Sequence, residues 1–187
     1  AIRPRSYPPF DLKRLLTTVF EPAGGERTFV LIDLDDPARV KDFAFLGDPS
    51  LTIQRHAHDV FHQGLLGGVA DALGLEYEGL FAYQQTGGSN LDLPDRVVSF
   101  DGRELSFERD IYPKADLILC ISTYSATAPL TAEAKRHGFR GATLHGLNES
   151  ILSSGLAVDY HEVSRKAEAL RTALTRADGF EIDFVVD

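Results

Sequence analysis

Residues 28–34 read TFVLIDL, and this stretch decides the fold class. Nearly all of its side chains are apolar, mostly β-branched or aromatic, and the apolar character continues without alternation. Such a run is typical of a strand covered on both faces, as in a parallel sheet. Residues 115–121, ADLILCI, show the same pattern. We therefore predict two buried strands at the centre of a mostly parallel sheet.

Strand and helix patterns alternate along the rest of the chain. Further strands are predicted at 76–83 and 141–144, and a hairpin at 96–107, where the dipeptide Asp101-Gly102 is a strong turn signal. Apolar residues at helical spacing predict helices at about 12–19, 51–73, 129–137 and 159–174. This order predicts an α/β fold with a Rossmann-like layered sheet, mostly parallel, with helices on both faces and a short hairpin insertion.

The length of 187 residues suits one domain. Residues 1–9 are rich in proline and are expected to form a flexible arm, so residues 10–187 form the single α/β domain. The last helix should begin at Asp159, because an N-cap aspartate is followed by Glu162 three residues later. Residues 180–186 alternate like a strand, so residues 175–187 are expected to supply an edge or swapped strand.

Charge and composition exclude some classes of partner. Twenty-eight acidic and 19 basic side chains give a net charge of −9, which opposes binding to a nucleic-acid backbone. Apolar runs fall short of the roughly 18 residues that a membrane span requires, so we expect no membrane partner. The single cysteine, Cys120, fits a reducing compartment, and a cytoplasmic location is expected. Because it lies in an apolar strand, its thiol is expected to be buried and inert.

Polar residues follow the predicted strands, at the edge where open α/β sheets bind ligands. The candidate ligand-binding residues are Asp33, Asp35, Gln85, Thr86, Ser89, Asn90, Ser122, Thr123, Tyr124, Ser125, His145 and Asn148. Their hydroxyl, amide and carboxylate groups suit a small molecule or a peptide backbone. The alternative is that each segment is a turn, since these residue types are what turns require.

The sharpest local pattern is His58-Asp-Val-Phe-His62. Histidines at positions i and i+4 of a helix can bind one zinc ion, and Glu76 or Glu78 would have to supply the third ligand. On a regular helix, however, both histidines lie off the apolar stripe. We therefore expect partly exposed side chains and no bound metal, with a His58/His62 metal site as the alternative. The sequence lacks dinucleotide-binding, Walker and nucleophile-elbow motifs, and we expect no cofactor.

Three segments carry a resemblance to a known family. The stretch Phe20–Arg27 leading into TFVLIDL, the segment ADLILCIS with the following Ser125–Leu130, and the terminal GFEIDFVVD all resemble the amino-terminal domain of the aminopeptidase T (thermophilic metallo-aminopeptidase) family. The similarity spans roughly residues 10–187 and lies in scaffold segments. In that family, Glu, His, Tyr and Asp side chains of the following domain bind two metal ions, and no stretch of this sequence matches them.

The resemblance implies an excised front domain or a stand-alone relative that lacks aminopeptidase activity. We therefore predict a non-catalytic, aminopeptidase-like domain that binds a peptide or protein partner, as an accessory protein in peptide processing or modification, and that forms a homo-oligomer such as a dimer. The alternative is a metal-dependent hydrolase or small-molecule enzyme that uses His58 and His62 or the polar strand ends.

Overall fold

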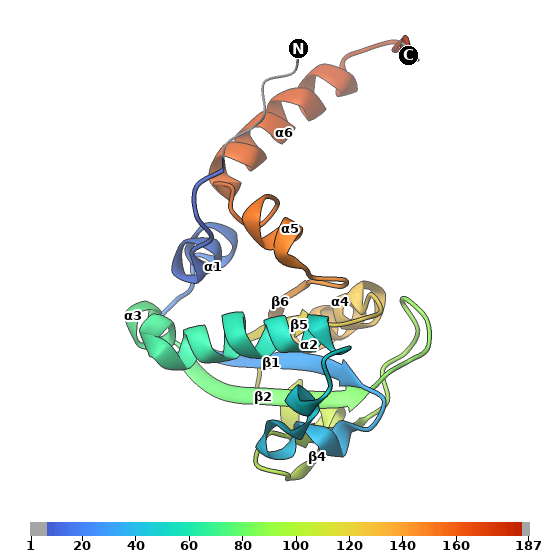
Figure 1. The fold of residues 1–187 in the computed structure, drawn as a ribbon. Coiled ribbons are helices and arrows are strands. Elements are labelled where there is room, and N and C mark those ends of the chain that lie inside the picture. Colours follow the sequence, from blue (N-terminus) through green and yellow to red (C-terminus); the bar gives the residue numbers. More distant parts are fainter. Residues whose placement is uncertain (1–6, 185–187) are drawn as a thin grey trace.

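The computed structural model describes residues 7–184 and contains one six-stranded sheet with the strand order β4-β3-β2-β1-β5-β6 (Figure 1). The strands are β1 (Arg27–Leu34), β2 (Glu76–Gln84), β3 (Arg96–Ser99), β4 (Glu104–Ser106), β5 (Leu117–Ile121) and β6 (Arg140–Thr143). The strands predicted at 28–34, 76–83, 115–121 and 141–144 and the hairpin at 96–107 are thus confirmed, with small shifts at their ends. The fold is α/β, as expected from the sequence.

The sheet is mixed and mostly parallel. Strand β1 pairs in parallel with β2 and β5, and β5 pairs in parallel with β6. The β3–β4 hairpin adds two antiparallel strands next to β2. Every residue of β1 from Thr28 to Leu34 is buried, as the apolar run predicts. Cys120 on β5 is also buried.

Buried side chains form two clusters, and alternate residues of β1 contribute to each. Val30, Ile32 and Leu34 belong to the first cluster, whereas Phe29 and Leu31 belong to the second. Four helical elements lie along the chain among these strands: α1 (Leu12–Phe20) precedes β1, η1 (Pro37–Gly47) follows β1, η4 (Phe107–Ile111) follows β4 and α4 (Thr127–His137) follows β5.

The segment 51–73 was expected to be one helix in which the glycines indicate close packing on the sheet or a break. It is helical from Thr52 to Leu73, with an interruption at Gly68. It consists of α2 (Thr52–His56), the wide-turned π-helical segments η2 (Ala57–His62) and η3 (Leu65–Val69), and α3 (Ala70–Leu73). Two glycines in this segment explain its close packing on α1 and its interruption. Gly64 packs so closely on α1 that an added Cβ would lie 2.7 Å from Leu12 Cδ2, and Gly68 adopts a φ of 114°.

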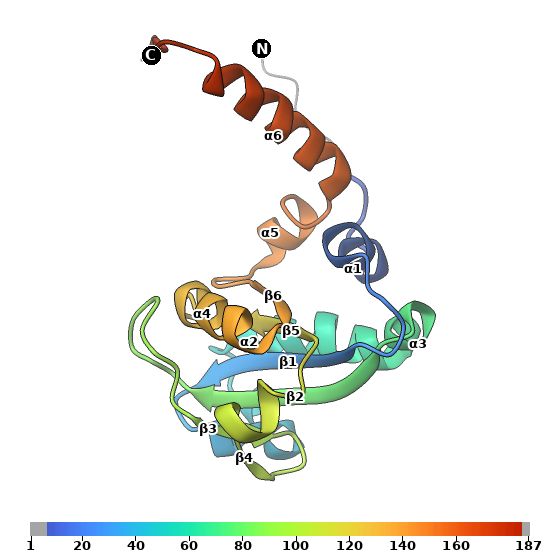
Figure 2. The same ribbon diagram turned by 180° about the vertical axis from the view of Figure 1, so that it is seen from behind.

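The last part of the chain extends away from the sheet. After α5 (Glu149–Ser153), helix α6 (Tyr160–Thr175) projects from the rest of the molecule in both views (Figure 2). Asp159 caps this helix as predicted, accepting hydrogen bonds from the backbone N–H groups of His161 and Glu162.

Two expectations concern the ends of the chain. Residues 179–184 form no strand, so the expected terminal strand is not found in them, and residues 185–187 lie outside the described residues. In the expected proline-rich arm, residues 7–9 have no regular structure and are exposed, and residues 1–6 also lie outside the described part.

Candidate functional site

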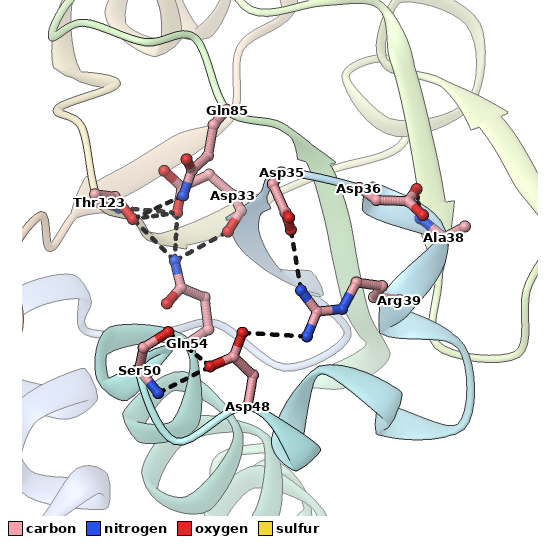
Figure 3. Close-up of polar contacts among 10 residues, drawn as sticks. All are labelled: Asp33, Asp35, Asp36, Ala38, Arg39, Asp48, Ser50, Gln54, Gln85 and Thr123. Carbon is pink, nitrogen blue, oxygen red and sulfur yellow. Dashed lines mark hydrogen bonds and ion pairs between the residues drawn. The ribbon is translucent and has the colours of Figure 1, made fainter.

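The carboxyl ends of β1 and β5 lie side by side where the order of the sheet reverses, because β2 and β5 flank β1. Asp33 on β1 and Thr123 just after β5 meet there, as the position of ligand sites in such sheets predicts. The Asp33 Oδ1 accepts hydrogen bonds from the Thr123 backbone N–H at 2.8 Å and from the Thr123 hydroxyl at 3.1 Å (Figure 3).

Gln54 of α2 fills the space between these two strand ends. Its side-chain Nε2 donates to Asp33 Oδ1 at 2.8 Å, to the Asp33 carbonyl at 3.0 Å and to Thr123 Oγ1 at 2.9 Å (Figure 3). Gln85 Nε2 donates to the same hydroxyl at 3.2 Å. Gln54 was not identified from the sequence. The only signal for a buried glutamine was its position directly after the apolar Ile53.

Asp33 is only 1% exposed. Its Oδ2 atom is buried and has no hydrogen-bond partner among the described residues. The other carboxylate oxygen is fully used by groups of the chain itself. This arrangement joins α2 to two strands, and a water molecule or a proton suffices to satisfy the second oxygen.

Asp35 does not join Asp33 but takes part in a separate ion-pair group (Figure 3). Arg39 Nη1 lies 3.2 Å from Asp35 Oδ1, and its Nη2 lies 3.4 Å from Asp48 Oδ2. Hydrogen bonds from the hydroxyl and backbone N–H of Ser50, aided by Arg39, hold the pKa of Asp48 below its ordinary value. These contacts order the turn around the start of η1, where the Asp36 carboxylate accepts a hydrogen bond from the Ala38 N–H.

Three of the candidate ligand-binding residues, Ser89, Asn90 and Ser125, connect the loop after β2 to the loop after β5. The Ser125 N–H donates to Ser89 Oγ at 3.2 Å, and the Ser125 hydroxyl donates to Asn90 Oδ1 at 3.3 Å. Asn90 Oδ1 also accepts from the Ala128 N–H at the start of α4. These residues are brought together, but their polar atoms bind one another, as the turn interpretation expects.

The remaining candidates are spread along the same edge. Thr86 donates to the Gly88 carbonyl within its turn, and Ser122 donates to the Tyr124 carbonyl. Asn148 caps α5 by accepting from the Ile151 N–H at 3.0 Å. His145 is exposed.

The expectation that His58 and His62 are partly exposed was wrong, because they are 9% and 2% exposed. Their rings lie 5.5 Å apart, and Phe43 packs against both. A regular helical wheel misplaces the two histidines, because η2 has wider turns than an α-helix. Phe43, whose backbone is left-handed (φ 57°), covers both rings.

Hydrogen bonds already engage the histidine rings. His62 Nδ1 lies 2.7 Å from the Tyr77 hydroxyl, and His58 Nδ1 lies 2.6 Å from Asp59 Oδ1. Burial, with a smaller contribution from His58, lowers the pKa of His62 to about 4. Of the two expected third ligands, Glu76 is exposed and Glu78 pairs with Arg27 at 2.6 Å. Within residues 7–184, neither histidine belongs to a group of three metal-ligand side chains.

Helix α6 carries an exposed apolar stripe, and none of its residues is buried. Val163, Leu170 and Leu174 are 44%, 61% and 51% exposed. An open groove of about 810 Å³ runs along this stripe and is bordered on its other side by Tyr7 and Pro8. This groove is much larger than the small apolar pocket of about 150 Å³ between α1 and β6.

Comparisons of the chain with models of protein families, with curated proteins and with solved structures found no match. None of the described helices is both long enough and apolar enough to span a membrane.

Proposed function

We propose that the chain is a non-catalytic, aminopeptidase-like domain that binds a protein partner through α6, and that this partner is a second copy of the chain. The observation that carries the proposal is the exposure of the apolar stripe on α6, which has no buried residue. Exposed apolar surfaces of this kind mark interaction sites in soluble proteins. The polar groups at the strand ends, by contrast, mostly bind one another.

The spacing of the stripe fits pairing with another helix. Tyr160, Val163, Ala167, Leu170 and Leu174 follow one another at alternating intervals of three and four residues. This alternation is the a/d repeat of a coiled coil, in which each apolar side chain packs between four residues of the facing helix. Tyr160 is already partly buried against the first core cluster, so the four later residues supply the free surface.

Charge favours an antiparallel arrangement of two copies. Asp159 caps the start of α6 and Glu162 lies in its first turn, whereas Arg171 lies in its second half and Arg176 is its C-cap. Antiparallel pairing places the acidic end of each helix beside the basic end of the other and opposes the two helix dipoles. A parallel pair would instead place Lys166 opposite Arg171 of the second copy, and like charges there oppose assembly.

The size of the helix limits the strength of the pair. Sixteen residues span about 24 Å, which is short for a two-stranded coiled coil. The buried area therefore falls at the low end for specific interfaces, where association is weak and transient. We expect an equilibrium between monomer and dimer that depends on protein concentration in the micromolar range.

Sedimentation equilibrium over a range of concentrations tests the proposal. Leu170→Glu places a charge in the seam and should leave the protein monomeric at every concentration. Leu66→Glu is a matched control, because Leu66 is 62% exposed and Leu170 is 61% exposed. A wild-type protein that stays monomeric, or a dimer that persists in Leu170→Glu, contradicts the proposal.

Cysteine cross-linking tests the orientation. In the antiparallel pair Val163 faces Leu174 of the second copy, so a mixture of the Val163→Cys and Leu174→Cys variants should form a disulfide-linked dimer. Each variant alone should not. The native thiol does not interfere, because Cys120 is buried. Efficient disulfide linking of Val163→Cys alone indicates a parallel pair. If the variants instead form disulfides with an unrelated cysteine-bearing helix as efficiently as with each other, that result contradicts self-association.

The proposal also includes a Rossmann-like layering of the fold, a cytoplasmic location and a protein rather than a nucleic-acid partner. The two separate core clusters support a Rossmann-like layering with helical elements on both faces of the sheet. The reduced, buried Cys120 is compatible with the proposed cytoplasmic location. The overall charge of −9 supports a protein partner over a nucleic acid.

A further inference from the structure

Three metal-ligand side chains meet at a place that is separate from α6. Glu133 and His137 lie one turn apart on α4, and Glu108 reaches toward them from η4. One ligand atom of each residue lies within 4.8 Å of the other two. The i, i+4 spacing of Glu133 and His137 is the arrangement that allows two side chains on one helix to bind the same ion.

The distance between the two helical ligands fits coordination better than a hydrogen bond. His137 Nε2 lies 3.4 Å from Glu133 Oε2. A charged N–H···O bond would be about 2.7–2.9 Å. By contrast, bonds of about 2.0–2.1 Å to a tetrahedral zinc ion place two ligand atoms about 3.3 Å apart. The pair is thus already near the spacing that zinc requires.

Both of these ligand atoms also lack a hydrogen-bond partner among the described residues, although Arg136 lies within ion-pair distance of Glu133. Glu133 Oε2 and His137 Nε2 have no contact with solvent and no hydrogen bond to a described residue. A pocket of about 310 Å³ is lined by Glu133, and by Asp92, Asp95 and Glu108, but not by His137. The carboxylates around this pocket favour a cation, and the pocket leaves room for a water molecule as the fourth ligand.

Arg136 is the group that competes with an ion. Its Nη1 lies 3.4 Å from Glu108 Oε1 and 3.5 Å from Glu133 Oε2. Its side chain is 63% exposed, so it can move into the solvent at small cost. Glu108 is also exposed, and the three ligand atoms, which lie within 4.8 Å of one another, must draw closer to complete the site.

We propose that Glu108, Glu133 and His137 bind a zinc ion, with water as the fourth ligand. The ion would join η4 to α4 and replace Arg136 as the positive charge between the two glutamates. Zinc suits this set because it accepts imidazole nitrogen and carboxylate oxygen in tetrahedral sites. The proposal is independent of self-association through α6.

The test is a titration of the metal-free protein with zinc chloride in competition with a chromogenic chelator. We expect one equivalent to bind per chain. His137→Ala and Glu108→Gln should each weaken binding at least about tenfold, since ligand sets are sensitive to single losses. Glu108 is exposed, so its variant should fold normally, and circular dichroism checks this. Arg136→Ala should bind zinc more tightly than the wild type, because it removes the competing cation.

His161→Ala is the matched control. His161 Nε2 also lies near a glutamate, 3.7 Å from Glu21 Oε1, but on the exposed side of α6. This variant should bind zinc as the wild type does. No stoichiometric binding, or binding unchanged in both His137→Ala and Glu108→Gln, overturns the proposal. Tight binding that disappears in His161→Ala overturns it as well and points to a surface site.

Discussion

His62 is buried, which differs from the partly exposed environment that its sequence context predicts. It is 2% exposed, its ring lies among Phe43, Tyr77 and Phe100, and Nδ1 contacts the Tyr77 hydroxyl. Burial therefore keeps the neutral imidazole and lowers its pKa to about 4 from an ordinary value of 6.5. Such a shift couples protonation to folding.

The pH dependence of unfolding tests this environment. Below about pH 6.5 the unfolded chain binds a proton at His62 and the folded chain does not, so the free energy of unfolding should decrease as the pH falls toward 4. The loss amounts to roughly 3–4 kcal/mol at most, because each pKa unit of the shift from 6.5 to about 4 corresponds to about 1.4 kcal/mol. Urea unfolding of His62→Gln should show a smaller decrease between pH 7 and pH 4.5. The exposed control His161→Gln should match the wild type, and an unchanged slope in His62→Gln would exclude a buried, neutral ring.

The candidate site shows which residues a sequence can place. The contact between Asp33 and Thr123 follows from the sheet topology. Asp33 lies at the carboxyl end of β1 and Thr123 just after that of β5, and these neighbouring strand ends lie where the strand order of the sheet reverses. The bond from Gln54 depends on the local course of α2, and burial of His58 depends on the wide turns of η2. The group of Glu108 with His137 joins η4 to α4, and neither element signals this contact in its own residues.

Among the elements, α6 depends most on its own local interactions. Tertiary packing supplies most of the stability of ordinary protein helices, but no residue of α6 is buried. The helix relies on the Asp159 cap and on ion pairs such as Glu162 with Lys166, 2.6 Å apart. The lower pKa of Glu162, caused by the hydrogen bond from Lys166, agrees with that contact.

Removal of the cap should therefore unfold part of this helix. Asp159→Ala leaves two backbone N–H groups without an acceptor and should cost about 1 kcal/mol. We expect reduced helical circular dichroism in Asp159→Ala while the thermal transition of the sheet stays in place. Asp178→Ala, which changes an exposed aspartate after the helix, is the control. Full helicity of Asp159→Ala at low protein concentration would show that packing on the domain supports α6.

The predictability of the elements follows from how each is stabilised. All of β5, and β1 from Thr28 to Leu34, are buried, so the apolar runs of these strands identify them. The segment 51–73 has the apolar spacing of one helix, but Gly68 at positive φ interrupts it. The FEIDFV residues of 180–185 have strand spacing, yet no described strand lies beside residues 180–184 to pair with them.

At the scale of the whole molecule, a packed sheet carries a single projecting helix (Figures 1 and 2). Almost all of the buried apolar residues precede Tyr160 in the chain. The stability of the sheet should consequently be independent of α6, apart from the contacts of Tyr160 and of the start of the helix with α1.

The separation of the packed sheet from the projecting helix α6 determines where proteases should cut the chain first. The bonds after Arg165, Lys166, Arg171 and Arg176 lie in a helix that can unfold locally without disturbing the core, and such segments are cleaved first. Brief trypsin digestion followed by mass spectrometry should therefore yield a resistant fragment that ends near Arg165, before any cut within the sheet. Leu170→Glu should be trimmed at the same rate at every concentration, whereas the wild type should be trimmed more slowly as its concentration rises. Initial cuts spread evenly along the chain would contradict this separation.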